Sequence, residues 1–253
     1  MLGHRSYGLG AHRVVLLNDW TQDTTSWDGL LPFLDGDRFT WTFVDLRGYG
    51  ASRHLRGDWT ATEAATDVLE LADAEGWPRF SLVGHSMSTL VAVHLAQHQK
   101  ERLERLVLVC PPPPAGFGAP DEVVAWLGAT ARGDEATRAA LFGADRLGIE
   151  WARWKAAAWC ATSEPEAVAG YVPLFTRDGL PDPAAPVLVP TLALCGEEDQ
   201  KSMRSAGVLE SYGPLSADLR VVGLPDVGHY PMIELPPRTA RLLQEFLGSG
   251  VRS

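Results

Sequence analysis

Short apolar runs alternate along the chain with segments of helical periodicity, and this alternation predicts an α/β protein. The runs expected as strands are 14–18, 41–46, 80–85, 106–110, 191–196 and 219–224. Several lack polar residues at alternate positions, which is typical of strands buried on both faces of a parallel sheet. Helices are expected at 60–76, 86–99 and 237–247. Units of this kind predict a doubly wound, mostly parallel sheet with right-handed crossovers.

One long segment interrupts this rhythm. Residues 111–188 begin with four consecutive prolines and continue with helical, tryptophan-rich sequence. A connection of this length is too long for a simple crossover between two strands. We therefore expect a core formed by 1–110 and 189–253. The segment 111–188 is expected to be an inserted helical cap over the carboxyl ends of the strands, where open α/β sheets bind ligands.

Three tryptophans of this segment have two interpretations. Trp151, Trp154 and Trp159 either line a pocket for an apolar substrate or pack a cap helix against the core. The substrate itself is not readable from the sequence, because that information lies in the cap.

Composition and charge narrow the class of protein. An apolar content of 45% and a charged content of 21% are those of a soluble globular protein. The net charge of −10 argues against a nucleic acid or an anionic membrane as partner. The three cysteines show neither zinc-type spacing nor a disulfide framework. No metal is therefore expected.

The segment that begins the chain bears on localisation. Residues 1–10 lack the hydrophobic region of a signal peptide, and no apolar stretch approaches membrane-spanning length. We expect a cytoplasmic protein that acts on a small apolar molecule. A homodimer is left open, because the sequence does not determine the oligomeric state.

The stretch LVGHSMSTL (82–90) carries the candidate nucleophile. Ser86 lies between a predicted strand and a predicted helix, as in the nucleophile elbow G-x-S-x-G, with Ser88 in place of the last glycine. Such a turn projects the serine side chain outward at a helix N-terminus. The amide of Met87 would then point at a developing oxyanion.

A serine hydroxyl is a weak nucleophile unless a base takes its proton. His229 follows the predicted strand 219–224, and the acids Glu197, Glu198 and Asp199 follow the predicted strand 191–196. Both loops are expected to meet Ser86 at the carboxyl edge of the sheet. The chain order serine, acid, histidine is that of a hydrolase triad, with the choice of acid open at this point.

Taken together, these stretches resemble the α/β-hydrolase family with a cap domain, over nearly the whole chain. The similar segments are SWDGLLPFL (26–34), DLRGYGAS (45–52), GHSMS (84–88), LCGEED (194–199) and VGHYPMIELP (227–236). The resemblance favours Asp199 as the acid. It implies that Ser86 attacks a carbonyl, that His229 acts as base and then acid, and that Asp199 orients the imidazole. It implies no cofactor.

One loop departs from the family pattern. The family commonly has His-Gly after its third strand, whereas this chain has Asn18-Asp19 and then Trp20. By position, the Trp20 amide becomes the second oxyanion donor, and Asn18 and Asp19 lie on the substrate side. Asp19 either places a negative charge near the oxyanion, which opposes hydrolysis, or points into solvent and caps the loop.

The leading functional hypothesis is a serine hydrolase that cleaves a small-to-medium apolar ester or lactone through an acyl-enzyme on Ser86. One alternative is non-ester chemistry on the same fold, such as a C–C hydrolase, a lyase or a cofactor-free oxygenase, and Asn18-Asp19 motivates it. The other is a hydrolase-like sensor of small molecules, for which Ser88 is the hint.

Overall fold

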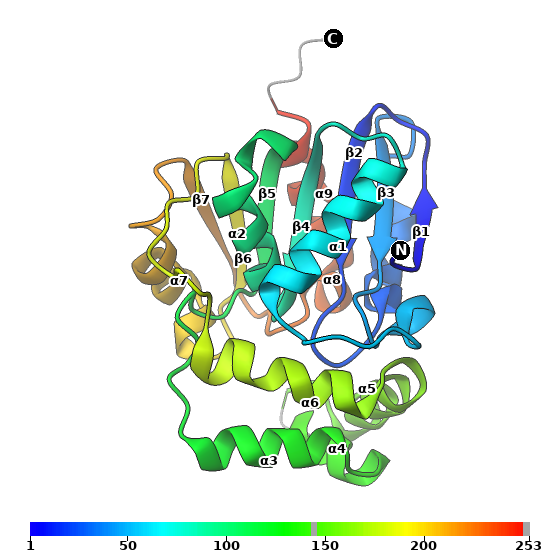
Figure 1. The fold of residues 1–253 in the computed structure, drawn as a ribbon, viewed down its shortest axis with the longest axis vertical. Coiled ribbons are helices and arrows are strands. Elements are labelled where there is room, and N and C mark those ends of the chain that lie inside the picture. Colours follow the sequence, from blue (N-terminus) through cyan, green and yellow to red (C-terminus); the bar gives the residue numbers. More distant parts are fainter. Residues whose placement is uncertain (143–145, 250–253) are drawn as a thin grey trace.

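The computed structural model describes residues 1–142 and 146–249, which form a seven-stranded sheet flanked by helices (Figure 1). The strands are β1 (His4–Tyr7), β2 (His12–Leu17), β3 (Phe39–Val44), β4 (Phe80–His85), β5 (Leu103–Val109), β6 (Thr191–Gly196) and β7 (Leu219–Leu224). Their order is β1-β3-β2-β4-β5-β6-β7, with β1 antiparallel to β3 and the other neighbours parallel. The predicted fold class is confirmed. Only β1 lacks a sequence prediction, because this partly exposed edge strand, HRSY, has no apolar run.

The described helices lie between the strands and after the last one. The α-helices are α1 (Ala61–Ala74), α2 (Ser88–His98), α3 (Asp121–Ala131), α4 (Glu135–Phe142), α5 (Ile149–Thr162), α6 (Pro165–Pro173), α7 (Ser205–Tyr212), α8 (Pro231–Glu234) and α9 (Pro236–Leu247). The 3₁₀ helices are η1 (Thr24–Phe33), η2 (Gly50–Ser52), η3 (Lys100–Arg102) and η5 (Lys201–Met203), and η4 (Leu174–Asp178) is a π-helix. The segment that resembles the family's first helix is the 3₁₀ helix η1, with Pro32 inside it.

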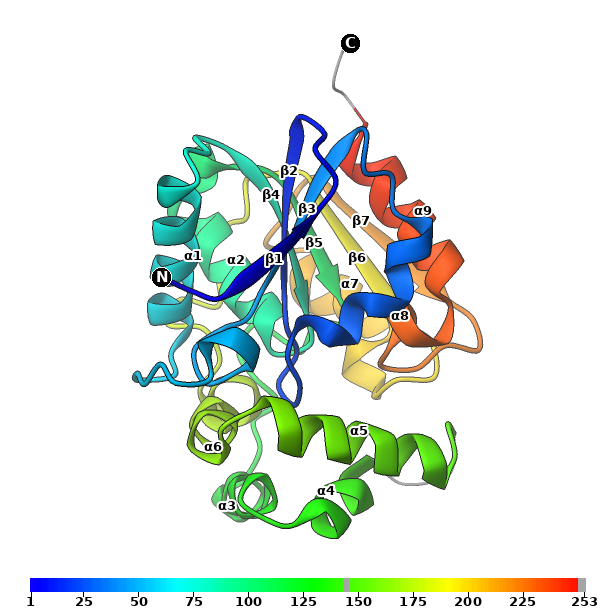
Figure 2. The same ribbon diagram turned by 90° about the vertical axis from the view of Figure 1, so that its right-hand side faces the viewer.

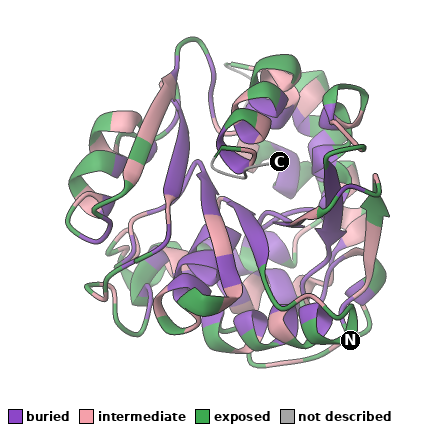
Figure 3. Ribbon diagram, turned by 90° about the horizontal axis from the view of Figure 1, so that it is seen from above, coloured by how far each residue is buried: buried purple, intermediate pink, exposed green. Residues whose placement is uncertain are grey.

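Both faces of the sheet are buried, which explains the continuous apolar runs. Along β2, Val15 and Leu17 pack into the cluster that contains α1, α2 and α7. Val14 and Leu16 pack on the opposite face, with η1, α8 and α9. Figure 2 shows the two helical layers on either side of the strands, and Figure 3 shows that the central strands are the buried layer. Successive side chains of a strand point to opposite faces of the sheet, so a strand buried on both faces is apolar at consecutive positions.

The segment between β5 and β6 forms a separate helical layer. Helices α3 to α6 lie across the carboxyl ends of the strands, with α5 and α6 next to the core and α3 and α4 farther out (Figures 1 and 2). All four helices fall within the predicted cap, 111–188. Of the helices in the described part of the chain, none combines the length and the apolar character needed to cross a bilayer.

Candidate active site

Ser86 occupies a strained turn between β4 and α2. Its φ is 56°, in the left-handed region that non-glycine residues rarely adopt. The amide of Ser86 donates to the carbonyl of Val109 at the end of the neighbouring strand, at 2.9 Å, which holds the turn against the sheet. Backbone strain of this kind persists only where the surroundings enforce it, and it is concentrated at functional sites.

The two ends of the elbow motif have different requirements. A Cβ on Gly84 would meet the carbonyl of Ser88 and the Cα of Thr89, both at 2.7 Å, so this glycine permits the helix to start against the strand. Ser88 replaces the motif's last glycine and is fully buried. Its hydroxyl accepts from the amide of His85 at 3.0 Å and donates to the carbonyl of the same residue at 3.1 Å. Ser88 therefore links the two ends of the turn.

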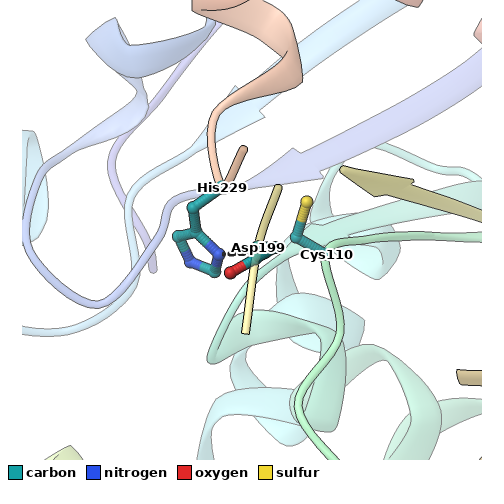
Figure 4. A group of neighbouring side chains, drawn as sticks. All are labelled: Cys110, Asp199 and His229. Atoms are coloured by element: carbon teal, nitrogen blue, oxygen red, sulfur yellow. Dashed lines mark hydrogen bonds and ion pairs between the residues drawn. The ribbon is translucent and has the colours of Figure 1, made fainter. Parts of the chain in front are cut away.

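The structure brings Ser86, His229 and Asp199 into one chain of hydrogen bonds. Nε2 of His229 lies 2.8 Å from Oγ of Ser86. Nδ1 of His229 lies 2.7 Å from Oδ2 of Asp199, the contact drawn in Figure 4. An ionised carboxylate only accepts, so Nδ1 carries the proton and Nε2 accepts from the serine hydroxyl. This is the protonation state in which an imidazole acts as a general base towards serine.

Electrostatics support that assignment. Burial alone would lower the pKa of His229, but the Asp199 carboxylate raises it above the ordinary value of 6.5. Burial likewise opposes ionisation of Asp199, and the charge and hydrogen bond of His229 lower its pKa overall. His85 is different: burial and the neighbouring His229 lower its pKa to about 3. His85 is thus neutral, and its Nε2 donates to the carbonyl of His229 at 2.7 Å.

The loop that carries His229 is held by Glu234 from α8. The Glu234 carboxylate accepts from the amide of Gly228 at 2.9 Å and from the amide of Tyr230 at 3.1 Å, one on each side of the histidine. It also pairs with the Arg146 guanidinium of the cap. Pattern reading missed Glu234. Its signal is the spacing His-x-x-x-x-Glu at the start of a short helix, where a carboxylate meets free amides.

Cys110, Asp199 and His229 place three possible metal-binding atoms within 4.8 Å of one another (Figure 4). Burial raises the pKa of the Cys110 thiol well above its usual value, which disfavours the thiolate that a metal needs. Both nitrogens of His229 are already engaged, with Asp199 and with Ser86. The donor set therefore fits the hydrogen-bond chain better than a metal.

The loop after β2 carries Asn18, Asp19 and Trp20, and its side chains are tied into the core and the cap. Asn18 is fully buried and is not among the residues that line the cavity beside Ser86, so the structure does not bring it to the predicted substrate side. Its Oδ1 accepts from the amide of Leu46 at 2.8 Å, and its Nδ2 donates to the carbonyl of Asp19 at 2.7 Å. The hydroxyl of Tyr49 donates to the carbonyl of Trp20 at 2.7 Å. These contacts fix the backbone of the loop to the core.

Asp19 caps its loop but does not point into solvent. It is 2% exposed, and its Oδ1 accepts from the amides of Thr21 and Gln22, each at 2.7 Å. Its Oδ2 accepts from Nζ of Lys155 on α5 at 2.8 Å. Burial opposes the charge, but Lys155 lowers the pKa of Asp19 below its usual value. The carboxylate is therefore ionised, and its charge is balanced by the cap.

Ser86 and His229 open into a cavity of about 590 Å³ between the core and the cap. Asp19 and Trp20 reach it from the loop after β2. Aromatic side chains form much of its wall: Phe142, Trp151 and Phe175 from the cap and Tyr230 from the histidine loop. At the outer side, the partly exposed Val123 and Trp126 of α3 complete the lining. A cavity of this size accommodates a small-to-medium organic molecule.

The three candidate tryptophans Trp151, Trp154 and Trp159 take different positions. Trp151 lines the cavity. Trp159 is fully buried and packs against Trp20, with ring centroids 5.4 Å apart, so it supports the cavity from behind. Trp154 is 50% exposed and does not reach the cavity, which corrects its predicted role. The reason is the helical period, because Ala152, Ala156 and Trp159 form the buried face of α5 and Trp154 lies opposite.

Fold and site together define a class of enzyme, the hydrolases built on a doubly wound sheet. The chain belongs to the alpha/beta hydrolase family, whose model matches residues 14–242. It is a hydrolase, as predicted.

Relatives of several activities are similar to this chain. A pimeloyl-[acyl-carrier protein] methyl ester esterase of Aeromonas hydrophila is 28% identical, over 93% of this chain and 95% of the relative. A soluble epoxide hydrolase of Corynebacterium sp. is 32% identical over 38% of this chain, and the match spans only 33% of that relative. Among solved structures, an enol-lactonase from Burkholderia xenovorans has a TM-score of 0.84 at 26% identity, covering 98% of this chain and 96% of the other.

Proposed function

We propose that this hydrolase cleaves a small-to-medium, apolar, uncharged ester or lactone through an acyl-enzyme on Ser86. The observation that carries the proposal is the hydrogen-bond chain from Ser86 through His229 to Asp199, at 2.8 and 2.7 Å. In the first step, the oxygen of Ser86 bonds to the carbonyl carbon and its proton passes to Nε2 of His229. The alcohol leaves with that proton. Water then attacks the acyl carbon and gives a proton to Nε2 of His229, which returns it to the oxygen of Ser86 as the acid leaves.

The nature of the nucleophile favours acyl transfer over epoxide opening. Attack of serine on an epoxide carbon gives an alkyl ether, which water and an imidazole base do not hydrolyse. An acyl ester, in contrast, has a carbonyl that water attacks in the second step. The amides of Met87 and Trp20 are proposed as the oxyanion donors in both steps. Met87 is the N-cap residue of α2, where the helix dipole adds to the stabilisation of negative charge.

The charges around the cavity indicate an uncharged substrate. Apart from the catalytic His229, Arg146 is the one basic residue among the described residues that line it. Its guanidinium pairs with Glu234 and donates to the carbonyl of Asp226 at 2.8 Å, so it is already neutralised. The remaining charged lining residues are acids, including Glu198 and Asp199. A carboxylate on the substrate would therefore meet repulsion without a cationic partner.

The alternative of non-ester chemistry depended on an uncompensated charge at Asp19. Because Lys155 pairs with that carboxylate, the loop does not present the unbalanced field that motivated the alternative. The sensor alternative depended on Ser88, whose buried hydroxyl has a local role within the turn. Neither alternative is favoured by a specific contact.

The test begins with a fluorophosphonate that carries no charge. We expect one covalent adduct by intact mass, and no adduct on Ser86→Ala. Turnover is then measured on p-nitrophenyl esters of increasing acyl length and on matched esters that end in a carboxylate. We expect kcat/KM for the neutral esters to exceed that for their carboxylate analogues by at least about tenfold, since one unpaired charge costs more than 1.4 kcal/mol.

Two results would contradict the proposal. Absence of the adduct would reject Ser86 as an activated nucleophile. Equal or better turnover of the carboxylate esters would reject the uncharged substrate class while leaving the acyl-enzyme in place.

A further inference from the structure

A fully buried lysine lies at the boundary between the cap and the core. Lys155 projects from α5, and its side chain has no exposed surface. Its ammonium donates to Oδ2 of Asp19 and to Oε1 of Gln22, each at 2.8 Å, and lies 4.7 Å from the centre of the Tyr230 ring. A buried ammonium requires partners of this kind, because losing water without them is costly.

All three partners belong to the catalytic side of the boundary. Asp19 and Gln22 flank the loop that presents the Trp20 amide, and Tyr230 follows His229 directly. The loop is tied to the cap a second time, because Nε1 of Trp20 donates to the carbonyl of Val168 on α6 at 2.7 Å. The cap is therefore bound to the oxyanion loop by an ion pair and by a neutral hydrogen bond.

We propose that Lys155 is a positioning residue for the oxyanion site, which neutralises Asp19 and fixes the loop that carries the Trp20 amide. This inference rests on the proposed acyl-enzyme function. Without the ammonium, the carboxylate would face a developing oxyanion as an unbalanced negative charge in a site of low dielectric. With it, the loop keeps its position and presents its amide without that charge. The cap thus contributes to the chemistry as well as to the shape of the cavity.

The charges of Asp19 and Lys155 also act on the pKa of the catalytic His229. The pH dependence of the rate is therefore a readout that a merely structural role of Lys155 would not change. Asp19 raises the pKa of His229, and Lys155 lowers it, so the two charges act on the base in opposite directions. The other titratable or charged groups around His229 are Asp199 after β6, His85 at the end of β4, the neighbouring Tyr230, Cys110 after β5, and Glu234 with its partner Arg146. None of these residues is substituted when only the pair is altered, although His85 and Tyr230 also contact the pair.

The experiment compares the wild type with Lys155→Met, Asp19→Asn and the double variant. The rate of p-nitrophenyl butyrate hydrolysis and the rate of fluorophosphonate labelling are measured against pH. In Lys155→Met, Asp19 keeps its hydrogen bonds from Thr21 and Gln22, which favour its charge. We expect the acid limb of the pH–rate profile, where His229 loses its proton, to move to higher pH. We also expect kcat to fall by roughly 10- to 100-fold, comparable to the loss of an oxyanion donor.

The other two variants test for a shift of the acid limb in the opposite direction and for recovery of the wild-type profile. Asp19→Asn leaves the ammonium unpaired, so the acid limb should move to lower pH. The double variant replaces the ion pair by neutral groups, and its acid limb should return towards that of the wild type, with part of kcat recovered. Arg153→Met is the matched control, because this exposed cation lies on the same helix and pairs with the exposed Glu150. It should change neither limb nor rate.

Thermal melts identify variants that do not fold. If Lys155→Met is among them, Asp19→Asn and the double variant still differ by the Lys155 charge alone, and the double variant must have the higher acid-limb midpoint. The inference would be overturned if the acid limb moved in the same direction in both single variants. It would also be overturned if the acid limb moved in neither variant although Ser86 was still labelled. Failure to label Ser86 in the wild type would instead reject the function on which it rests.

Discussion

Removal of the Glu234 carboxylate should disable the histidine loop. In Glu234→Ala, the amides of Gly228 and Tyr230 lose an acceptor that is 5% exposed. Hydrogen bonds to a charged group contribute about 1.5–3 kcal/mol each, so the two together contribute roughly 3–6 kcal/mol. Arg146 is 35% exposed, and its share of the pair adds about 0–1 kcal/mol. Water from the adjoining cavity replaces part of the loss, so we expect a destabilisation of about 3 kcal/mol.

The consequence for activity follows from geometry. His229 lies between the two released amides, and a displacement of about 1 Å of a catalytic group costs on the order of 10²-fold in rate. We expect kcat on p-nitrophenyl esters to fall by roughly 10- to 100-fold with a smaller change in KM. The melting temperature should fall by about 6–12 °C, from about 2–4 °C per kcal/mol for a chain of this size.

Two related variants make this prediction specific. Glu234→Gln keeps one acceptor oxygen and should lie between the wild type and the alanine variant. Glu245→Gln breaks an exposed pair with Arg241 on α9 and should leave rate and melting temperature unchanged. A Glu234→Ala enzyme with kcat within twofold of the wild type would refute the role of these two hydrogen bonds in holding His229.

The remaining predictions concern the elbow and the base. Ser88→Ala removes both hydrogen bonds to His85 and should lower the free energy of unfolding by about 1–3 kcal/mol, measured by urea unfolding. Gly84→Ala should prevent folding or nearly abolish fluorophosphonate labelling, because its Cβ would meet backbone atoms at 2.7 Å. A stable, fully labelled Gly84→Ala would contradict this. The acid limb of kcat/KM should have its midpoint above pH 6.5, because the base must be neutral and Asp199 raises the pKa of His229. Asp199→Asn removes that charge and should move the limb to lower pH, and an unmoved limb would assign it to another group.

The fold was largely readable from the sequence because its strands are buried on both faces. In β4 and β6 every residue is buried, so apolar runs alone locate them. The start of α1 was also readable, since the side chain of Thr60 accepts from the amide of Glu63 at 3.1 Å. The edge strand β1 and the short helices α7 and α8 were not, because an exposed edge and one or two helical turns leave little periodicity to detect.

The candidate site was readable where its residues follow strands. Ser86 and His229 stand directly after, or close after, predicted strands, so the topology brings them to one edge of the sheet. Glu234 and Lys155 were not recognised, because each acts through a partner that the sequence does not identify. Lys155 contacts Asp19 across 136 positions of the chain. Its local signal was its place between Trp151 and Trp159 at spacings of four, in the middle of a stripe that faces the core.

That pairing changes how the departure from the family's His-Gly should be tested. Restoring glycine at position 19 would remove a charge, but it would also leave the Lys155 ammonium buried beside Gln22 and Tyr230 without an anion. Breaking a buried pair by removing one partner costs about 3–5 kcal/mol, so the single variant reports instability together with chemistry. Asp19→Gly combined with Lys155→Met separates the two effects. If esterase activity rises only in the combined variant, the ion pair is a constraint on the loop; if it falls in both, the charged loop is the arrangement that this serine requires.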